Sequence, residues 1–317
     1  MNKRILIFGS GVIGSVYGGL LAKAGYDISL LARGKRLKDL QEKGLLLQRA
    51  MCPQAETEAI AVRVVSELRP DDAYDYVFVT LRAEQVEEAL PVLAANASGC
   101  FVFMVNHAGG YDRWESIIGK GKVLVAFPGA GGRIDEEGKV FYSLTSRLIQ
   151  PSTLGEPDGS LTPRIRELRR MLRKAGFPTA GCRNMDAWQK THLALVCPLA
   201  CAIYCDGGNS RTLANNRQVL TQLCKALRET FAFIHRSGIG ITPGKYRLMH
   251  IIPLPLMRFV LSRIYASSWA ETFIDDHTRH ARGEMMYLTE ALIALAARHG
   301  CELKELGRLL TGRIDSK

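Results

Sequence analysis

The chain has 317 residues, of which 47% are hydrophobic and 23% are charged, and its formal net charge at pH 7 is +11. This length and composition are typical of a globular protein with two domains, each with its own core. The basic residues are scattered and no nucleic-acid motif accompanies them, so we attribute the positive excess to anionic small molecules and expect no nucleic-acid partner.

The sequence carries no strong targeting or membrane signal. Residues Met1–Arg4 lead straight into a strand, without the apolar region of a signal peptide. The apolar run 249–266 is interrupted by residues such as His250, Pro253 and Arg258 and is too broken to cross a bilayer. We interpret this run as an amphipathic helix that packs inside the protein or at a subunit contact, with a membrane-surface role as the alternative. A cytoplasmic protein with no membrane partner is predicted, and a homodimer is left open.

The eight cysteines form no CxxC pair, so neither a zinc knuckle nor a disulfide scaffold is indicated. Cys197, Cys201 and Cys205 are spaced by four residues and share one face of a predicted helix. Three thiolates on one face could bind a soft metal, but cysteine is also a common small core residue. We predict no metal site.

The most informative motif is a glycine fingerprint near the N-terminus. The apolar run Arg4–Phe8 predicts a strand, Ser15–Ala24 predicts a helix, and Gly9-Ser10-Gly11-Val12-Ile13-Gly14 lies between them. In this context the first glycine permits a tight turn, the second lets the backbone approach a pyrophosphate, and the third lets helix and strand pack closely. The motif therefore predicts a dinucleotide site.

The next strand, Asp27–Leu31, is followed by Arg33, which lies 19 residues after Gly14. NAD sites place a carboxylate at about this distance, where it binds the ribose 2′-hydroxyl. A guanidinium suits a 2′-phosphate far better than a diol. Arg33 therefore predicts NADP(H) as the cofactor.

Apolar runs at 76–81 and 100–105 predict two more strands, with a helix at 84–94 between them. This alternation predicts a parallel sheet whose ligand lies beyond the carboxyl ends of the strands. Arg82 and Asn106 follow those ends, so we expect both to face the same crevice as the glycine loop.

Further strands are predicted at 122–127, 139–142 and 146–149, with a glycine-rich turn at 129–132 and a loop at 150–162. From about residue 184 the pattern becomes helical, which places a boundary near Gly181. The predicted fold class is α/β: an N-terminal Rossmann-type doubly wound sheet, residues 1–181, followed by an all-α domain, residues 182–317.

The helical half carries two groups of candidate catalytic residues. Trp188-Gln189-Lys190 opens it, and Thr272, Asp276 and Glu284 follow at separations that are multiples of four, which keeps them near one helical face. In this order and spacing the chain resembles the ketopantoate reductase (2-dehydropantoate 2-reductase) family along nearly its whole length.

The resemblance implies a role for each candidate. Lys190 matches the family's proton donor, Glu284 the glutamate that binds the substrate hydroxyls, and Thr272 a serine that holds the substrate carboxylate, with Asp276 beside it in the substrate site. The implied NADP(H)-binding residues are Gly9, Ser10, Gly11, Val12, Ile13, Gly14, Arg33, Arg82, Gln85 and Asn106, and Asn106 would also contact substrate.

Two departures from the family pattern concern the substrate. Family members carry asparagines four and eight residues after the lysine, where this chain has Ala194 and Pro198, and a glycine is replaced by His107. A lost polar contact of this kind costs roughly 1–3 kcal/mol of transition-state binding. Either the substrate differs, or His107, His192 or Asn209 compensates, or the chain is a decayed enzyme that still binds nucleotide.

The resemblance implies NADPH-dependent reduction of a branched 2-keto acid, by default 2-dehydropantoate to pantoate in pantothenate biosynthesis. Two alternatives stay open. One is a related NADP-dependent hydroxy-acid dehydrogenase with a different substrate, and the other is a non-catalytic NADP(H)-binding sensor.

Overall fold

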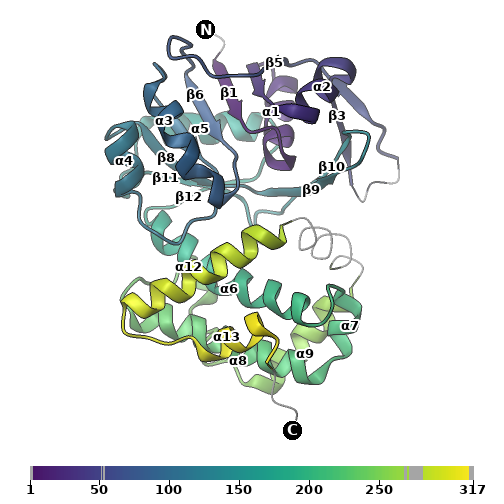
Figure 1. The fold of residues 1–317 in the computed structure, drawn as a ribbon, viewed down its shortest axis with the longest axis vertical. Coiled ribbons are helices and arrows are strands. Elements are labelled where there is room, and N and C mark those ends of the chain that lie inside the picture. The colour runs from purple at the N-terminus through teal and green to yellow at the C-terminus, as the bar shows by residue number, and fades with distance from the viewer. Residues whose placement is uncertain (1–2, 51, 53, 268–269, 271–280, 314–317) are drawn as a thin grey trace. The chain divides into compact units, whose positions relative to one another are not determined.

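The computed structural model describes residues 3–50, 52, 54–267, 270 and 281–313. The chain forms two compact units, whose elements are labelled in Figure 1. The first unit comprises Met1–Val105 and Tyr111–Met185. The second comprises Asp186–Lys317 together with a short insertion, Asn106–Gly110, that comes from the middle of the first unit's sequence.

The first unit is built on an eight-stranded sheet. Its strand order is β12 (Thr179–Gly181), β11 (Ser152–Gly155), β8 (Val123–Phe127), β7 (Phe101–Phe103), β6 (Tyr76–Val79), β1 (Arg4–Phe8), β2 (Asp27–Leu31) and β5 (Arg63–Val65). The strands from β8 to β5 are parallel, whereas β11 pairs with β8 antiparallel. The carboxyl ends of β1 and β6 therefore lie side by side at one edge, which is where such sheets bind ligands.

Helices cover both faces of this sheet. They are α1 (Val12–Lys23), α2 (Gly34–Lys43), α3 (Val86–Ala95), α4 (Asp112–Ile118) and α5 (Pro163–Lys174), with a short 3₁₀ turn at η1 (Ala83–Gln85). Ile5 and Ile7 of β1 pack into one core with Tyr17 of α1 and Leu168 of α5. On β7, Phe103 stacks instead on Trp114 of α4, with ring centroids 4.4 Å apart. The doubly wound α/β sheet predicted from the sequence is confirmed.

A second, four-stranded sheet packs on the outer side of α1. Its order is β4 (Glu58–Ile60), β3 (Leu45–Arg49), β10 (Val140–Leu144) and β9 (Ala130–Ile134). Glycines allow α1 to fit between the two sheets. A Cβ at Gly18 would lie 3.2 Å from Ile7, and one at Gly19 would lie 2.6 Å from Leu47 of the small sheet. This packing fixes the axis of the helix whose N-terminus adjoins the glycine loop.

Three local predictions in this region are wrong. The glycine-rich segment 129–132 is not only a turn, because it contains the first residues of strand β9. Glycine is required at 132, where a Cβ would lie 1.9 Å from the oxygen of Phe141 on β10. Residues 146–149 form a turn, with Leu148 87% exposed, rather than a strand. The predicted loop 150–162 contains β11, whose residues are buried on both sides.

The described part of the second unit is helical. Its helices are α6 (Met185–Cys205), α7 (Ser210–Asn215), α8 (Arg217–Arg236), α9 (Leu254–Tyr265), α12 (Arg282–Arg298) and α13 (Lys304–Thr311), with a 3₁₀ turn at η2 (Gly244–Tyr246). Glu229 of α8 accepts hydrogen bonds from the backbone N–H groups of Glu305 and Leu306 and so caps α13. No helix among the described residues is both long and apolar enough to cross a membrane.

Candidate functional site

The glycine loop has a backbone that only glycine fits at two of its three positions. Gly9 has a φ of +119°, and a Cβ there would lie 2.9 Å from the oxygen of Thr80. A Cβ at Gly14 would lie 1.8 Å from the oxygen of Gly9. The Thr80 hydroxyl donates a hydrogen bond to that same oxygen, 2.7 Å away, and ties the loop to the end of β6. The predicted roles of the first and third glycines in turn and packing follow directly from this geometry.

Gly11 has the opposite environment. A Cβ built on it would meet no atom within 4 Å, so this glycine borders open space. It is also the N-cap of α1, and no side chain caps that helix. The first backbone N–H groups of a helix lack intrahelical partners, and its dipole adds positive potential there. The loop thus presents an open, electropositive backbone, which is the environment that a pyrophosphate requires.

Arg36 braces the back of the loop. Its guanidinium donates to the oxygen of Ser10 at 3.2 Å, to the Ser15 hydroxyl at 3.0 Å and to the oxygen of Gly138 at 2.6 Å. Burial lowers the pKa of this guanidinium, an effect that Asp39 partly offsets. Arg36 therefore holds Ser10 in place from the protein side and is not available to a ligand.

Arg33 differs from Arg36 although it lies only three residues earlier. It is exposed, at the N-cap of α2 just beyond the end of β2. Within the described part of the chain its guanidinium makes no hydrogen bond or ion pair. The next cation, Lys35, is bound to Asp39 at 2.8 Å. Arg33 is accordingly the cation of this segment that is available to an anionic group.

Arg82 and Gln85 lie after β6, next to the strand that carries the glycine loop. Arg82 is exposed, three residues beyond the end of β6. The backbone N–H of Arg82 donates to Oε1 of Gln85 at 3.2 Å, so the Gln85 oxygen stabilises the turn that carries Arg82. Because β1 and β6 are parallel neighbours, Arg82 and Gly9 lie at the same edge of the sheet.

Asn106 and His107 belong to the short insertion of the second unit. Nε2 of His107 lies 3.2 Å from the oxygen of Gly110, which closes the insertion into a compact turn. A Cβ at Gly109 would lie 2.8 Å from that ring nitrogen, so Gly109 makes room for the imidazole. Sequence reasoning placed Asn106 in the first domain, and periodicity gave no sign that these residues pack with the second unit.

Lys190 is a buried cation held by one carboxylate. It lies in the second turn of α6, and its Nζ donates to Oδ2 of Asp186 at 2.6 Å. The side chain of Lys190 is 11% exposed and that of Asp186 35% exposed. An ammonium has three N–H donors, and one of them is directed to Asp186. Asp186 was missed from the sequence, although its spacing of four residues before Lys190 is the signal that would have identified it.

The next turns of α6 show how Ala194 and Pro198 are accommodated. Proline has no N–H, so the helical donor to the oxygen of Ala194 is missing. The hydroxyl of Thr230, on α8, donates to that oxygen at 2.8 Å instead. Helix α6 therefore continues through Pro198 to Cys205. Ala194 and Pro198, where the resemblance led us to expect asparagines, are both buried. The hydrogen bond from Thr230 to the Ala194 oxygen compensates for the donor that Pro198 lacks.

The side chains suggested to compensate for those amides already have structural roles. Oδ1 of Asn209 caps α7 by accepting from the N–H groups of Arg211 and Thr212. The ring of His192 stacks on Trp188 one helical turn earlier, with centroids 5.4 Å apart.

The cysteines of α6 are packed against α12. Sγ of Cys201 lies 3.6 Å from the Thr289 hydroxyl. Burial raises the pKa of Cys197 to about 12 and that of Cys201 to about 11, which keeps both as neutral thiols at pH 7. No group of three metal-ligating side chains occurs among residues that the structure describes. These contacts favour the interpretation of the cysteines as core residues.

Of the late-helix candidates, only Glu284 lies within the described residues, because Thr272 and Asp276 fall outside them. Glu284 is partly buried in the first turn of α12, where a carboxylate is stabilised by the helix dipole. Its charge acts on Tyr204 of α6, whose pKa is raised mainly by burial and also by nearby negative charge. The guanidinium of Arg282 lies 5.2 Å from the centre of the Tyr204 ring.

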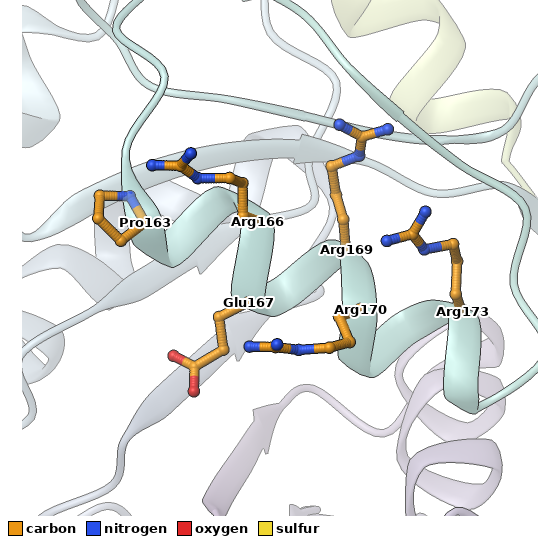
Figure 2. A pocket seen from close by; sticks show the side chains of 6 residues that line it. All are labelled: Pro163, Arg166, Glu167, Arg169, Arg170 and Arg173. Atoms are coloured by element: carbon orange, nitrogen blue, oxygen red, sulfur yellow. The ribbon is translucent and has the colours of Figure 1, made fainter.

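A hollow on α5 is separate from all of these residues. It is lined by Pro163, Arg166, Glu167, Arg169, Arg170 and Arg173, and Figure 2 shows Arg166, Arg169 and Arg173 on one side of the helix. Glu167 accepts a hydrogen bond from the hydroxyl of Tyr76, the first residue of β6, and pairs with Lys3, which immediately precedes β1. The hollow therefore lies near the amino ends of β1 and β6, away from the edge that carries Gly9 and Arg82.

Comparisons with known proteins agree with this fold. The sequence model of the family "Ketopantoate reductase PanE/ApbA" matches residues 5–153. The 2-dehydropantoate 2-reductase of Archaeoglobus fulgidus is 29% identical over 192 residues, which is 59% of this chain and 60% of the relative. That of Pyrococcus abyssi is 31% identical over 118 residues, 37% of each chain. The matches thus span about 60% or less of the curated relatives' length.

Solved structures resemble the chain over nearly its whole length. The 2-dehydropantoate 2-reductase of Geobacter metallireducens superposes with a TM-score of 0.79 at 17% identity, covering 98% of both chains. A D-mandelate dehydrogenase solved with NADH and anilino(oxo)acetate gives 0.76 at 14% identity, covering 98% of this chain and 96% of that one. At these identities the solved structures establish the shared fold. Residues 5–153 of the chain are similar in sequence to the ketopantoate reductase family.

Proposed function

We propose that the chain is an NADPH-dependent reductase of branched 2-keto acids. The observation that carries this proposal is Lys190, a buried ammonium held 2.6 Å from one carboxylate. Burying a cation is costly unless it is paired, so such a residue is seldom retained for stability alone. A chain that only senses a nucleotide has no need of a proton donor, whereas reduction of a carbonyl requires one.

The first unit supplies the features that a dinucleotide needs. The uncapped N-terminus of α1 and the open space at Gly11 would hold the pyrophosphate, and Arg33 would bind the 2′-phosphate. Arg82 would add a second cation near the phosphates. NADPH, when bound, supplies a hydride to the carbonyl carbon of the substrate.

The second unit would supply the acid chemistry. As the carbonyl carbon accepts a hydride, its oxygen becomes an alkoxide, which Lys190 would protonate. Asp186 would keep the ammonium in one orientation, and the remaining N–H donors of Lys190 would stabilise the developing negative charge. We assign Glu284 to the hydroxyl end of the substrate, Asn106 to cofactor and substrate, and Thr272 and Asp276 to the carboxylate end.

The name of these relatives, 2-dehydropantoate 2-reductase, makes 2-dehydropantoate the first substrate to test. Ala194 and Pro198 stand where two amides would bind it, and Thr230 donates a hydrogen bond to the Ala194 oxygen that Pro198 leaves without a helical donor. A second candidate activity follows from this loss: an NADP-dependent hydroxy-acid dehydrogenase that accepts a more apolar substrate. The similarity in fold to a D-mandelate dehydrogenase makes aromatic 2-keto acids a reasonable class to include.

The test is a set of initial-rate measurements of NADPH oxidation with 2-dehydropantoate, shorter branched 2-keto acids and aryl 2-keto acids. The proposal predicts turnover with at least one of them and a kcat/KM for NADPH well above that for NADH. If 2-dehydropantoate is poor and an aryl or alkyl keto acid is good, the second candidate is correct. Tight NADPH binding without turnover on any substrate would contradict the reductase and favour a sensor.

A further inference from the structure

Helix α2, which follows Arg33 directly, has few apolar side chains to hold it in place. Of its ten residues, Leu37 and Leu40 are the large apolar ones, and Leu40 is buried whereas Leu37 is only partly buried. Packing of an apolar face is what normally fixes a surface helix on its sheet. The placement of α2, and with it that of Arg33, therefore depends in part on polar contacts.

The turn between β9 and β10, residues 135–139, supplies such contacts. Three cations of α2 donate hydrogen bonds to three successive backbone oxygens of this β9–β10 turn. The donors and acceptors are Lys35 and Glu136 at 3.2 Å, Lys43 and Glu137 at 3.2 Å, and Arg36 and Gly138 at 2.6 Å. The two lysine contacts are exposed, whereas that of Arg36 is partly buried. Water competes less for a buried contact, so Arg36 contributes most to holding α2 against the turn.

Asp135 gives the turn the shape that presents these oxygens. Oδ1 of Asp135 accepts hydrogen bonds from the N–H of Glu137 at 3.1 Å and from that of Lys139 at 2.8 Å. Its backbone oxygen accepts from the N–H of Gly138, also at 3.1 Å. Three donors of the turn are thus satisfied by one residue, which is a common role of aspartate in turns. The backbone oxygens of residues 136–138 are left to accept from α2.

Gly138 lets the turn approach α2 closely. It is buried and has a φ of +87°, and a Cβ there would lie 3.2 Å from Nη1 of Arg36 and 3.4 Å from Cβ of Asp39. A larger residue would be strained at this φ and would press on the guanidinium. The close contact between the turn and α2 therefore depends on glycine at this position.

Arg36 joins the turn to the glycine loop as well. The guanidinium that binds the Gly138 oxygen also donates to the oxygen of Ser10 at 3.2 Å and to the hydroxyl of Ser15 at 3.0 Å. One side chain thus connects the β9–β10 turn, the glycine loop and α2. In the proposed function, the glycine loop holds the pyrophosphate of the cofactor and Arg33 holds its 2′-phosphate.

From this arrangement we infer that the β9–β10 turn is a positioning element for recognition of the 2′-phosphate of NADP(H). Asp135 and Gly138 act through α2: they set the place of Arg33 relative to the glycine loop and do not themselves bind the cofactor. The four-stranded sheet then contributes to the choice between NADPH and NADH. This inference rests on the proposed roles of Arg33 and the glycine loop. NADH lacks the 2′-phosphate, so its binding should depend little on the turn.

The experiment measures the Kd of NADPH and that of NADH by isothermal titration of the full-length protein. Asp135→Ala removes the acceptor that shapes the turn, and Gly138→Ala adds a Cβ beside Arg36. Each should raise the Kd of NADPH about 5- to 10-fold and that of NADH less than about twofold. Asp135→Asn keeps an acceptor oxygen and should restore most of the affinity for NADPH.

A matched control and a double-mutant cycle separate positioning from stability. Asp158 accepts the N–H of Ser160 at 2.9 Å in another exposed turn of the first unit, so Asp158→Ala should leave both Kd values unchanged. In an Arg33→Gln background, Asp135→Ala should change the Kd of NADPH less than about twofold, because the contact that the turn positions is already absent. Lys43→Gln alone should also have less than about a twofold effect, because the Arg36 contact remains. Thermal unfolding confirms that each variant is folded.

Three results would overturn the inference. One is an unchanged Kd of NADPH in the folded turn variants. Another is an equal rise in the Kd of NADPH and NADH, which would assign the turn to the stability of the loop. The third is an additive effect of Arg33→Gln and Asp135→Ala on NADPH binding. A protein that binds no NADPH at all would overturn the proposed function together with this inference. Absence of turnover alone would contradict the reductase without affecting these binding measurements.

Discussion

The glycine loop of the first unit and helix α6 of the second differ in how strictly their structure restricts the residue type at each position. In the loop, the proposed cofactor contacts depend on the backbone: Gly9 and Gly14 are fixed by contacts with Thr80 and with each other, and Gly11 borders open space. In α6, the proposed chemistry depends on the side chain of Lys190, and the Ala194 oxygen in the next turn accepts a hydrogen bond from Thr230. A site made of backbone groups tolerates almost no substitution, whereas side chains around a lysine can change without moving the backbone.

Replacing Lys190 should have the largest effect on activity. Lys190→Met keeps the length of the side chain but removes the proton donor, so kcat should fall about 10²- to 10⁴-fold while NADPH affinity stays the same. Steady-state kinetics and a fluorescence titration with NADPH measure the two quantities. Lys225→Met, on the exposed side of α8, is the matched control. If Lys190→Met keeps the unmodified rate, the lysine is structural and the proposed mechanism is wrong.

Two glycine substitutions in the loop should separate binding from folding. Gly11→Ala adds a methyl group to open space at a normal φ of −68°, so the melting temperature should hardly change. NADPH affinity should nevertheless fall about 10- to 100-fold, because the methyl group displaces the phosphate from backbone N–H groups. Gly14→Ala places a Cβ 1.8 Å from the oxygen of Gly9 and should destabilise the fold by about 3 kcal/mol.

Thermal unfolding and isothermal titration of the two glycine variants give the comparison. Loss of stability in Gly11→Ala with unchanged NADPH affinity would show that this glycine also serves packing and would remove it from the cofactor site.

Arg33 should determine the choice between the two nicotinamide cofactors. Arg33→Gln removes a charge-assisted contact to the 2′-phosphate, so the KM for NADPH should rise about 10- to 100-fold with little change for NADH. Lys35→Gln is the control, because Lys35 is also exposed but is paired with Asp39. An equal loss for NADPH and NADH would assign Arg33 to the general stability of the loop.

The smallest expected effect is on the stability of α6. Thr230→Val leaves the oxygen of Ala194 buried without a donor and should cost about 1–3 kcal/mol of unfolding free energy, whereas Thr230→Ser should cost much less. Pro198→Ala restores a helical N–H to that oxygen, so the same Thr230→Val change should then cost about 1 kcal/mol less. Urea unfolding of the four proteins of this cycle measures the coupling. Additive costs would mean that Thr230 does not replace the missing helical donor.

Sequence predicted the parts of the fold that rest on long periodic runs and on glycine geometry. The strands β1, β2, β6, β7 and β8, helix α1 and the helical second half follow from such patterns. Prediction failed where tertiary contacts overrode local composition. Gly132 belongs to a strand in which β10 passes so close that a Cβ would lie 1.9 Å from the oxygen of Phe141, and Leu148 is solvent-exposed although Ile149 beside it is apolar.

The candidate site was predictable to a similar, partial extent. The glycines and Arg33 could be named from spacing, and Lys190 from the family resemblance. The role of Arg36 as a brace could not, because its partners Ser10 and Gly138 lie 26 and 102 residues away in the sequence. The donation from Thr230 to Ala194 joins two helices, and helical periodicity contains no information on which helices meet.

The central claim is that this chain transfers a hydride from NADPH to a 2-keto acid with Lys190 as the proton donor. The most direct measurement follows deuterium from NADPH labelled at C4 of the nicotinamide into the product, by mass spectrometry, with the best substrate from the keto-acid series. The account predicts a 2-hydroxy acid that carries one deuterium at C2 with the unmodified protein, and a rate at least about 100-fold lower with Lys190→Met. A folded protein that binds NADPH but forms no labelled hydroxy acid from any 2-keto acid would contradict it.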